Sequence, residues 1–219
     1  MKWLFPSAIA AAVIALYLYD RNNGPQPDPG QPMTDNQSQE TTPIEDVQVA
    51  IDAAITPDTP PAPEVDPMAN RKAFLDMLAF SEGTSGPNGY NTLFGGGIFD
   101  SFADHPRKVF SFSNSKGEQL TTSAAGRYQF LARTWDSLKA KLSLPDFGPD
   151  SQDAAALELV RQRGAIPDVD AGRLDAAIQK CSPIWASLPG AGYSQPERKL
   201  TDLNRAYAQA GGTIDTQAA

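Results

Sequence analysis

The chain has 219 residues, enough for one domain of ordinary size and an additional segment. Its formal net charge is −8, yet residues 1–68 hold ten acidic and two basic side chains, whereas residues 69–219 hold sixteen of each sign. The acidic excess therefore belongs to the N-terminal part alone, and the rest lacks the basic face of a nucleic-acid-binding protein. We expect no nucleic-acid partner.

An apolar run without charged residues, from Trp3 to Tyr19, lies near the start of the chain. As a helix it would be about 25 Å long, slightly shorter than a hydrocarbon core of about 30 Å. Two interpretations are open, an uncleaved signal-anchor and a cleaved signal peptide. The lack of a small-residue cleavage site after Tyr19 favours the anchor. Residues 1–20 are thus predicted to be a transmembrane helix, with the N-terminus in the cytoplasm and the rest of the chain exported.

Residues 21–68 contain ten prolines and no aromatic residue. Such a composition cannot bury enough apolar surface to form a core. The segment is predicted to be a disordered, acidic, proline-rich tether. Residues 69–219 are then the folded domain.

The first part of that domain predicts one helix and two hairpins. Apolar residues recur at helical spacing over residues 71–82, with Asn70 as the expected N-cap and Gly83 just after the last turn. The segments 90–102 and 108–123 have aromatic and β-branched residues on either side of glycine-rich or polar turns. They predict a small antiparallel β region.

Helical patterns dominate the remainder of the chain. Either Asp150 or Ser151 is expected to cap the second of these helices, and the spacing of Ser194 and Glu197 is that of a capping box. The predicted fold class is α+β, mostly helical. The predicted helices cover residues 124–142, 150–165, 170–181 and 194–212.

A single carboxylate, Glu82, ends the first predicted helix in the sequence SEGT. The negative end of the helix dipole and nearby apolar residues disfavour its charged form, so the pKa of Glu82 should be raised. A carboxyl group that stays protonated near neutral pH can donate a proton to the leaving oxygen of a glycosidic bond. The alternative is an exposed glutamate at a frayed helix end.

Seven blocks of sequence extend over about residues 70–213: RKAFLDMLAFSEGT, DHPRK, AGRYQFLARTWD, SQDAAAL, RGAIP, CSPIWASLPGAGYSQ and AGGT. In order and spacing they resemble the endolysin family of bacteriophage lambda. The resemblance implies a lysozyme-like fold and a lytic transglycosylase that cleaves the MurNAc–GlcNAc bond of peptidoglycan to lyse the host cell, with Glu82 as the catalytic residue. Residues 1–68 depart from that family and resemble the signal-anchor-release segments of other phage endolysins, so the membrane would be the host inner membrane, with possible release into the periplasm.

The residues after Glu82 also favour a transglycosylase over a hydrolase with two carboxylates. Lysozymes of the phage T4 type place an aspartate nine residues after the glutamate, and here that position is Asn91. The first aspartates that follow are Asp100 and Asp104. Hydrolysis needs a second carboxylate, whereas a transglycosylase uses the C6 hydroxyl of the muramyl sugar as its nucleophile.

Five further residues are candidates for substrate binding. Gln129 is expected near the glutamate, because related lytic enzymes use a glutamine there to contact an acetamido group. Tyr128 could stack on a sugar ring or pack in the core, and Arg127 could bind a peptide or lactyl carboxylate or lie on the surface. Gln152 could contact substrate or cap a helix, and Tyr193 lies in a loop of the kind that often carries binding residues.

No metal or cofactor is expected. His105 is the single histidine and Cys181 the single cysteine, so neither a Cys/His metal cluster nor an intramolecular disulfide can form. His105 is expected to cap or pack, and Cys181 to be a buried structural thiol.

The expected partners are peptidoglycan glycan strands and, through residues 1–20, the host inner membrane, and the chain is expected to be a monomer. Two other functions stay open. One is a permanently anchored bacterial lytic transglycosylase or muramidase that remodels its own wall. The other is a non-catalytic wall-binding module.

Overall fold

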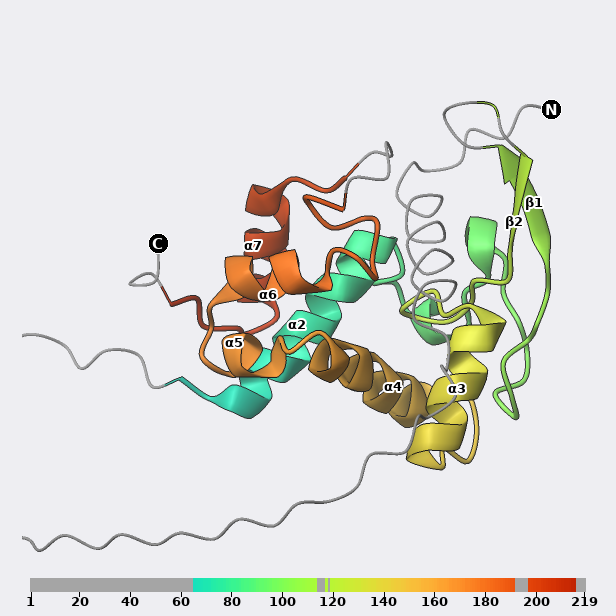
Figure 1. Cartoon of the computed structure of the whole chain (residues 1–219), viewed down its shortest axis with the longest axis horizontal. Coiled ribbons are helices and arrows are strands. Elements are labelled where there is room, and N and C mark those ends of the chain that lie inside the picture. The colour runs from blue at the N-terminus through green and yellow to red at the C-terminus, as the bar shows by residue number, and fades with distance from the viewer. Residues whose placement is uncertain (1–64, 114–116, 118, 192–196, 216–219) are drawn as a thin grey trace, which may run out of the picture. The chain divides into compact units, whose positions relative to one another are not determined.

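Helix α2, Pro67–Glu82, runs through the middle of the part of the chain that the structure describes (Figure 1). This computed structural model describes residues 65–113, 117, 119–191 and 197–215. The predicted transmembrane segment and residues 21–64 of the predicted tether lie outside the described residues. The other elements, in chain order, are the 3-10 helices η1 (Gly89–Asn91) and η2 (Phe94–Gly96), strands β1 (Phe110–Ser113) and β2 (Gln119–Thr122), and helices α3 (Ala132–Leu142), α4 (Pro149–Gln162), α5 (Ile166–Asp170), α6 (Leu174–Cys181) and α7 (Leu200–Gln209).

Both ends of α2 have the residues that helix ends require. Asp66 is the N-cap, its carboxylate accepts a hydrogen bond of 2.8 Å from the Met68 amide, and Pro67 occupies the first turn. Gly83 ends the helix in the left-handed conformation, with φ of 75°. The helix predicted over residues 71–82 is confirmed, but it begins at Pro67, two residues before the predicted domain boundary.

The predicted N-cap, Asn70, lies inside α2 and is buried. Its side-chain amide donates to the Asp170 carbonyl at 3.2 Å, and its side-chain oxygen accepts from the Thr213 amide at 2.8 Å. The prediction is wrong because the Asp-Pro pair just before it is a complete start signal. Asn70 instead connects α2 to the end of α5 and to the chain beyond α7.

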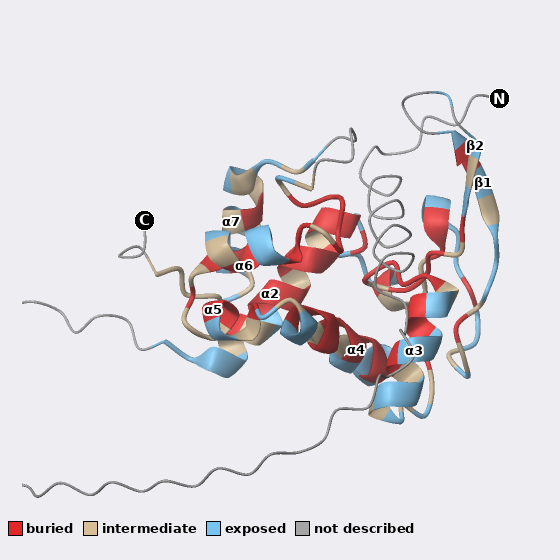
Figure 2. Cartoon of the chain, viewed as in Figure 1, coloured by how far each residue is buried: buried red, intermediate tan, exposed pale blue. Residues whose placement is uncertain are grey.

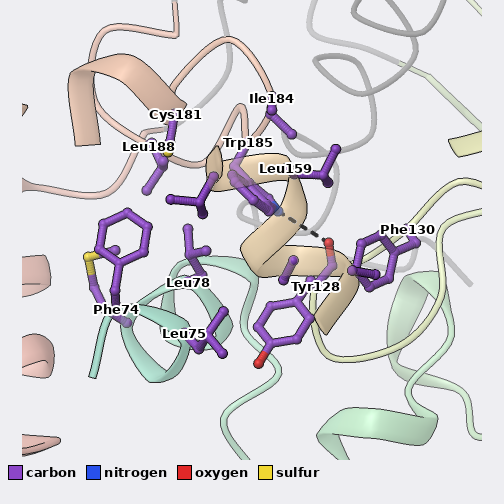
Figure 3. Close-up of a cluster of buried hydrophobic side chains, with 14 of the residues drawn as sticks. Phe74, Leu75, Leu78, Tyr128, Phe130, Leu159, Cys181, Ile184, Trp185 and Leu188 are labelled. Carbon is purple, nitrogen blue, oxygen red and sulfur yellow. Dashed lines mark hydrogen bonds between the residues drawn. The ribbon is translucent and has the colours of Figure 1, made fainter. Parts of the chain in front are cut away.

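Side chains of α2 are buried on more than one face. Ala73, Phe74 and Leu75 are consecutive and all buried, although successive helical residues point about 100° apart. The helix contacts α4, α5 and α7, and buried residues concentrate along α2 and α4 (Figure 2). Figure 3 shows Phe74 and Leu78 of α2 in one apolar cluster with Trp185. A helix enclosed in this way positions its last residue, Glu82, inside the protein.

Of the two predicted hairpins, only the second forms. Strands β1 and β2 pair antiparallel within the predicted segment 108–123. The segment 90–102 instead forms η1 and η2, with a single bridge between Thr92 and Ile98. Its glycines disrupt the strand, because Gly95 has φ of 82° inside η2.

The helix predicted over residues 124–142 is only half present. Residues 124–131 form a tight loop in which Ala125 and Phe130 exchange both backbone hydrogen bonds, at 3.0 and 2.9 Å. Gly126 and Gln129 have φ of 80° and 52°, which no right-handed helix accommodates. The helix α3 therefore begins at Ala132.

The C-terminal helices are confirmed in position and corrected at their ends. Neither Asp150 nor Ser151 caps α4, because the N-cap is Gly148, and the Ser151 hydroxyl donates to Asp146 at 2.9 Å. The short helix α5 was not predicted. Ser194, the first residue of the predicted capping box, lies outside the described residues. The fold is mostly helical with a two-stranded antiparallel sheet, as the predicted class requires.

The loop at Gly126 offers a test of its packing. A Cβ atom at this position would lie 2.3 Å from the Gln152 side-chain oxygen, in addition to the strain of a positive φ. We expect Gly126→Ala to lower the free energy of unfolding by about 2 to 4 kcal/mol, measured by denaturant unfolding. Gly96→Ala is the matched control, because Gly96 has φ of 89° and a Cβ added there would meet no atom within 4 Å. Equal losses in the two variants would contradict the close contact with Gln152.

Candidate active site

Glu82 is the last residue of α2 and has no exposed surface. One carboxylate oxygen, Oε1, accepts a hydrogen bond from the Ser187 hydroxyl at 2.6 Å. The other, Oε2, is buried and has no hydrogen-bond partner among the described residues. The two oxygens of this side chain therefore have different surroundings.

Ser187 belongs to the segment between α6 and α7, more than 100 residues from Glu82 in sequence. Its hydroxyl is also 3.0 Å from that of Ser81, which in turn donates to the Leu78 carbonyl at 2.8 Å. All three of the polar side chains in this group, those of Ser81, Glu82 and Ser187, are fully buried. Hydroxyl groups are thus the direct partners of the acid.

Arg198 supplies a positive charge at the C-terminal end of α2. Its guanidinium nitrogens lie 3.4 Å from the carbonyl oxygens of Phe80 and Ser81, and its charged carbon lies 5.1 Å from the centre of the Phe80 ring. Carbonyl groups at this end of a helix have no partner within the helix. A cation here offsets the negative end of the helix dipole.

Burial dominates the ionisation of Glu82 and raises its pKa from the ordinary 4.5 to about 8. The Ser187 hydrogen bond and the Arg198 charge favour the carboxylate, but they do not outweigh the loss of hydration. Glu158, a second glutamate with little exposure, shows the contrast, because the side chains of Arg161 and Lys141 lower its pKa to about 2. Glu82 is therefore protonated at neutral pH, which is the direction expected from its place in the sequence.

Two of the predicted substrate-binding residues, Tyr128 and Arg127, interact with other side chains of the protein. Tyr128 is fully buried, its hydroxyl donates to Asp153 at 2.6 Å, and its carbonyl accepts from the Trp185 indole at 3.3 Å (Figure 3). Arg127 forms an ion pair of 2.5 Å with Asp76 and lies 5.0 Å from the centre of the Tyr90 ring. Both residues lie in the loop of residues 124–131 and not in the helix that was predicted over residues 124–142.

The Gln152 side chain is buried and forms hydrogen bonds with three other segments of the chain. Its side-chain oxygen accepts from the Arg127 amide at 2.8 Å, and its side-chain nitrogen donates to the carbonyls of Phe147 and Tyr90 at 2.7 and 2.8 Å. The side chain lies in the first turn of α4 but caps no amide of that helix. It holds the loop of residues 124–131 against α4.

Gln129 has an acceptor atom that no described residue uses, and Arg127 has a buried nitrogen, Nε, that likewise has no partner among the described residues. Gln129 is fully buried, and its side-chain nitrogen donates to the Gly126 carbonyl at 2.9 Å. Its side-chain oxygen has no partner among the described residues. Tyr193, the fifth candidate, lies outside the described residues. The substrate-binding roles of all five residues stay predictions.

Asp100 and Asp104, either of which could be the second carboxylate of a hydrolytic mechanism, differ from Glu82 in exposure and in their partners. Asp100 is exposed. Asp104 accepts hydrogen bonds from Trp135, Lys139 and Arg107, which hold its pKa well below its usual range. Within the described residues, no group of three or more His, Cys, Asp or Glu side chains could hold a metal ion.

His105 and Cys181 have structural positions. His105 is buried, its Nε2 lies 2.9 Å from the Phe130 carbonyl, and its Nδ1 accepts from the Arg107 amide at 3.1 Å. Cys181 is buried and free, and burial raises the pKa of its thiol to about 12. Both residues pack within the protein.

Sequence reasoning missed Ser187 and Arg198, and for Asp153 it weighed a capping role against a substrate role but not the hydrogen bonds that it accepts from Tyr90 and Tyr128. Ser187 and Asp153 lie within blocks that carry the family resemblance, but nothing local marks either as a partner of a distant side chain. Their roles depend on contacts between segments far apart in the chain, which periodicity does not encode.

Comparisons with known proteins identify the class of enzyme. The sequence model of the Endolysin family matches residues 72–214. The endolysin of Escherichia phage lambda is 48% identical over 150 residues, which cover 66% of this chain and 92% of that protein. The endolysin of Escherichia phage P2 is 45% identical over 166 residues, which cover 68% of this chain and 98% of that protein.

Solved structures agree with the sequence matches. Bacteriophage lambda lysozyme in complex with a chitohexasaccharide has a TM-score of 0.62 and 48% sequence identity, and covers 67% of this chain and 97% of its own. A second structure of that lysozyme has a TM-score of 0.60 over the same share of each chain. The fold is thus lysozyme-like, and with its buried acid it is that of a peptidoglycan-degrading enzyme. The chain belongs to the endolysin family.

The same comparisons overturn the predicted localisation at the host inner membrane. Nearly the whole length of the lambda and P2 endolysins is matched by about two thirds of this chain, so the anchor on which the prediction depends has no counterpart in them. Among the helices that the structure describes, none combines the length and the apolar character that crossing a membrane requires. The prediction depends on residues 1–20, which lie outside that part of the chain.

Proposed function

We propose that this endolysin cleaves the MurNAc–GlcNAc bond of peptidoglycan as a lytic transglycosylase, with Glu82 as the single acid and base. The observation that carries the proposal is a fully buried glutamic acid whose pKa is raised to about 8 and whose Oε2 atom has no partner among the described residues. Burial, the Ser187 hydroxyl and the Arg198 charge are the influences on that pKa, and a second carboxylate is not among them.

The chemistry needs one proton to be moved twice. Protonated Glu82 donates its proton to the glycosidic oxygen as the bond to C1 of the muramyl sugar breaks. The resulting carboxylate removes the proton of the C6 hydroxyl of the same sugar, and that oxygen forms a new bond to C1. The product is a 1,6-anhydromuramyl end, no water is consumed, and Glu82 is again protonated. Because the nucleophile belongs to the substrate, its proximity replaces a second carboxylate.

The glycan is the proposed substrate, since the related lambda lysozyme has been crystallised with a chitohexasaccharide. Glu82 has no exposed surface in this structure, so glycan binding requires displacement of the side chains that cover it. We propose that Gln129, through its unpartnered side-chain oxygen, accepts a hydrogen bond from an acetamido group. Tyr128, Arg127 and Gln152 would act by holding the loop that carries Gln129.

Analysis of the reaction products tests the transglycosylase. The full chain is incubated with purified peptidoglycan in water enriched in the heavy oxygen isotope, and the muropeptides are weighed. We expect products about 18 Da lighter than hydrolytic ones, the mass of one water, without uptake of the label. A hydrolytic muramidase is the positive control for label uptake. Labelled products of hydrolytic mass from this chain would assign it to the muramidases instead.

The two other functions raised by the sequence are not favoured. Both curated relatives are phage endolysins, which argues against a bacterial wall-remodelling enzyme. A non-catalytic wall-binding module would gain nothing from a buried acid, because an unpaired ionisable group in the interior costs stability.

A further inference from the structure

The contacts of Ser187 distinguish the two oxygens of Glu82. The Ser187 hydroxyl lies 2.6 Å from Oε1 and 3.0 Å from the Ser81 hydroxyl, and it has a single proton to donate. A separation of 2.6 Å is typical of a hydroxyl that donates to a carboxylate, whereas 3.0 Å is long for two hydroxyls. The proton of Ser187 is therefore directed to Oε1, and the Ser81 hydroxyl donates its own proton to the Leu78 carbonyl at 2.8 Å.

We propose that Ser187 is a positioning residue that occupies Oε1 of Glu82 and thereby makes Oε2 the oxygen that gives and recovers the catalytic proton. The inference rests on the proposed function of Glu82 as acid and base. An acid proton placed on Oε1 would meet the Ser187 hydroxyl, whereas one on Oε2 meets no protein partner among the described residues. The reacting proton is thus on the oxygen that no described residue occupies, where a substrate oxygen can accept it once the covering side chains have been displaced.

The place of Ser187 does not depend on its hydroxyl. Its carbonyl accepts from the Arg198 amide at 2.9 Å, and its neighbours Trp185 and Leu188 are buried in the apolar cluster (Figure 3). Replacement by alanine removes one oxygen and leaves these contacts. The variant Ser187→Ala should therefore fold and isolate the effect of the hydrogen bond.

The direction of the pKa change separates positioning from packing. A hydrogen bond from Ser187 favours the charged form of Glu82, so its removal raises the pKa. A loosened interior would admit water to Glu82, which favours the carboxylate and lowers the pKa. The charged group that acts on Glu82 is Arg198, and it binds the carbonyls of Phe80 and Ser81, which the substitution leaves in place.

The experiment compares the pH dependence of peptidoglycan solubilisation for the full chain and for Ser187→Ala. On the alkaline side of the pH–rate profile, the rate should fall at a pH about one unit higher in the variant than in the parent. The maximal rate of the variant should be about 10- to 100-fold lower. Ser182→Ala is the matched control, because Ser182 is also buried, lies just after α6, and donates to Gln179 rather than to Glu82. If the rate of Ser187→Ala falls at the same alkaline pH as that of the parent, or at a lower pH, the proposal is overturned.

A second measurement does not depend on activity. The carboxyl carbon of Glu82 is followed by NMR in the labelled full chain, with Glu82→Gln identifying its signal, and its pKa should be higher in Ser187→Ala. If Glu82→Gln stays active, the proposed function fails, while the titration still tests the contact. If Glu82→Gln is inactive but the titration and the alkaline side of the pH–rate profile are unchanged in Ser187→Ala, only the role of Ser187 fails. If Ser187→Ala does not fold, Ser187→Cys, which keeps a weaker donor, should shift the pKa in the same direction by less.

Discussion

Replacement of Glu82 by glutamine is expected to lower the rate of peptidoglycan cleavage by about 10³-fold or more, because in the proposed mechanism one side chain carries out both proton transfers. Glutamine has nearly the same volume and can still meet the Ser187 hydroxyl, but it has no acidic proton to donate. The measurement is the initial rate of solubilisation of purified peptidoglycan by the full chain, followed by the decrease in turbidity.

Glu158→Gln is the matched control for this loss. Glu158 is also a glutamate with little exposure, but it lies within α4 and pairs with Arg161 and Lys141. Its replacement should leave the rate unchanged under conditions in which the variant is folded. A Glu82→Gln enzyme with an undiminished rate would show that another group supplies the proton.

The same substitution should alter how stability depends on pH. In the parent chain the pKa of Glu82 is about 8 when folded and 4.5 as an ordinary side chain. Between these values the unfolded chain has released the proton while the folded chain retains it, so the free energy of unfolding falls as the pH rises. The protonated carboxyl group of Glu82 makes its full contribution to the free energy of unfolding below about pH 4.5. That contribution is lost above about pH 8, and the loss amounts to at most about 5 kcal/mol.

Glu82→Gln should lack this decline and should be more stable than the parent at alkaline pH. Denaturant unfolding of both chains across this pH range measures the difference. Glu158 has the opposite dependence, and it lies below pH 4.5. Because its pKa is lowered to about 2, its carboxylate stabilises the folded parent above pH 4.5 and this contribution is lost as the pH falls through about 2, a loss that Glu158→Gln should lack. Parallel curves for the parent and Glu82→Gln would mean that the carboxyl group is hydrated in the folded chain.

Local signals in the sequence predicted the elements that local interactions determine. Gly83 predicts the end of α2 because glycine adopts the left-handed conformation of a helix C-terminus without steric cost. The end of the helix in turn determines where Glu82 lies. The polar turn between β1 and β2 likewise predicted a hairpin. The loop of residues 124–131 has apolar residues at helical spacing, which predict a helix, whereas the pairing of Ala125 with Phe130 gives it another shape.

The surroundings of the acid could not be predicted in the same way. The helix dipole and nearby apolar residues gave the direction of the pKa change, but the complete burial of Glu82 depends on Ser187 and Arg198, which approach α2 from the far end of the chain. The same limit applies to Gln152, whose partners Tyr90 and Arg127 lie 62 and 25 residues away. Roles that arise from such contacts require the folded structure.

The distance in sequence between Glu82 and the residues around it has a consequence for biosynthesis. A nascent chain that has emerged only as far as α4 already contains the acid, but it lacks Ser187 and Arg198 and leaves the carboxyl group hydrated, with the ionisation of an ordinary glutamate. Truncated translation products therefore carry an ionised side chain that cannot act as an acid at neutral pH. Under the mechanism proposed above, lytic capacity therefore requires that translation has passed the segment before α7 and that this segment has docked.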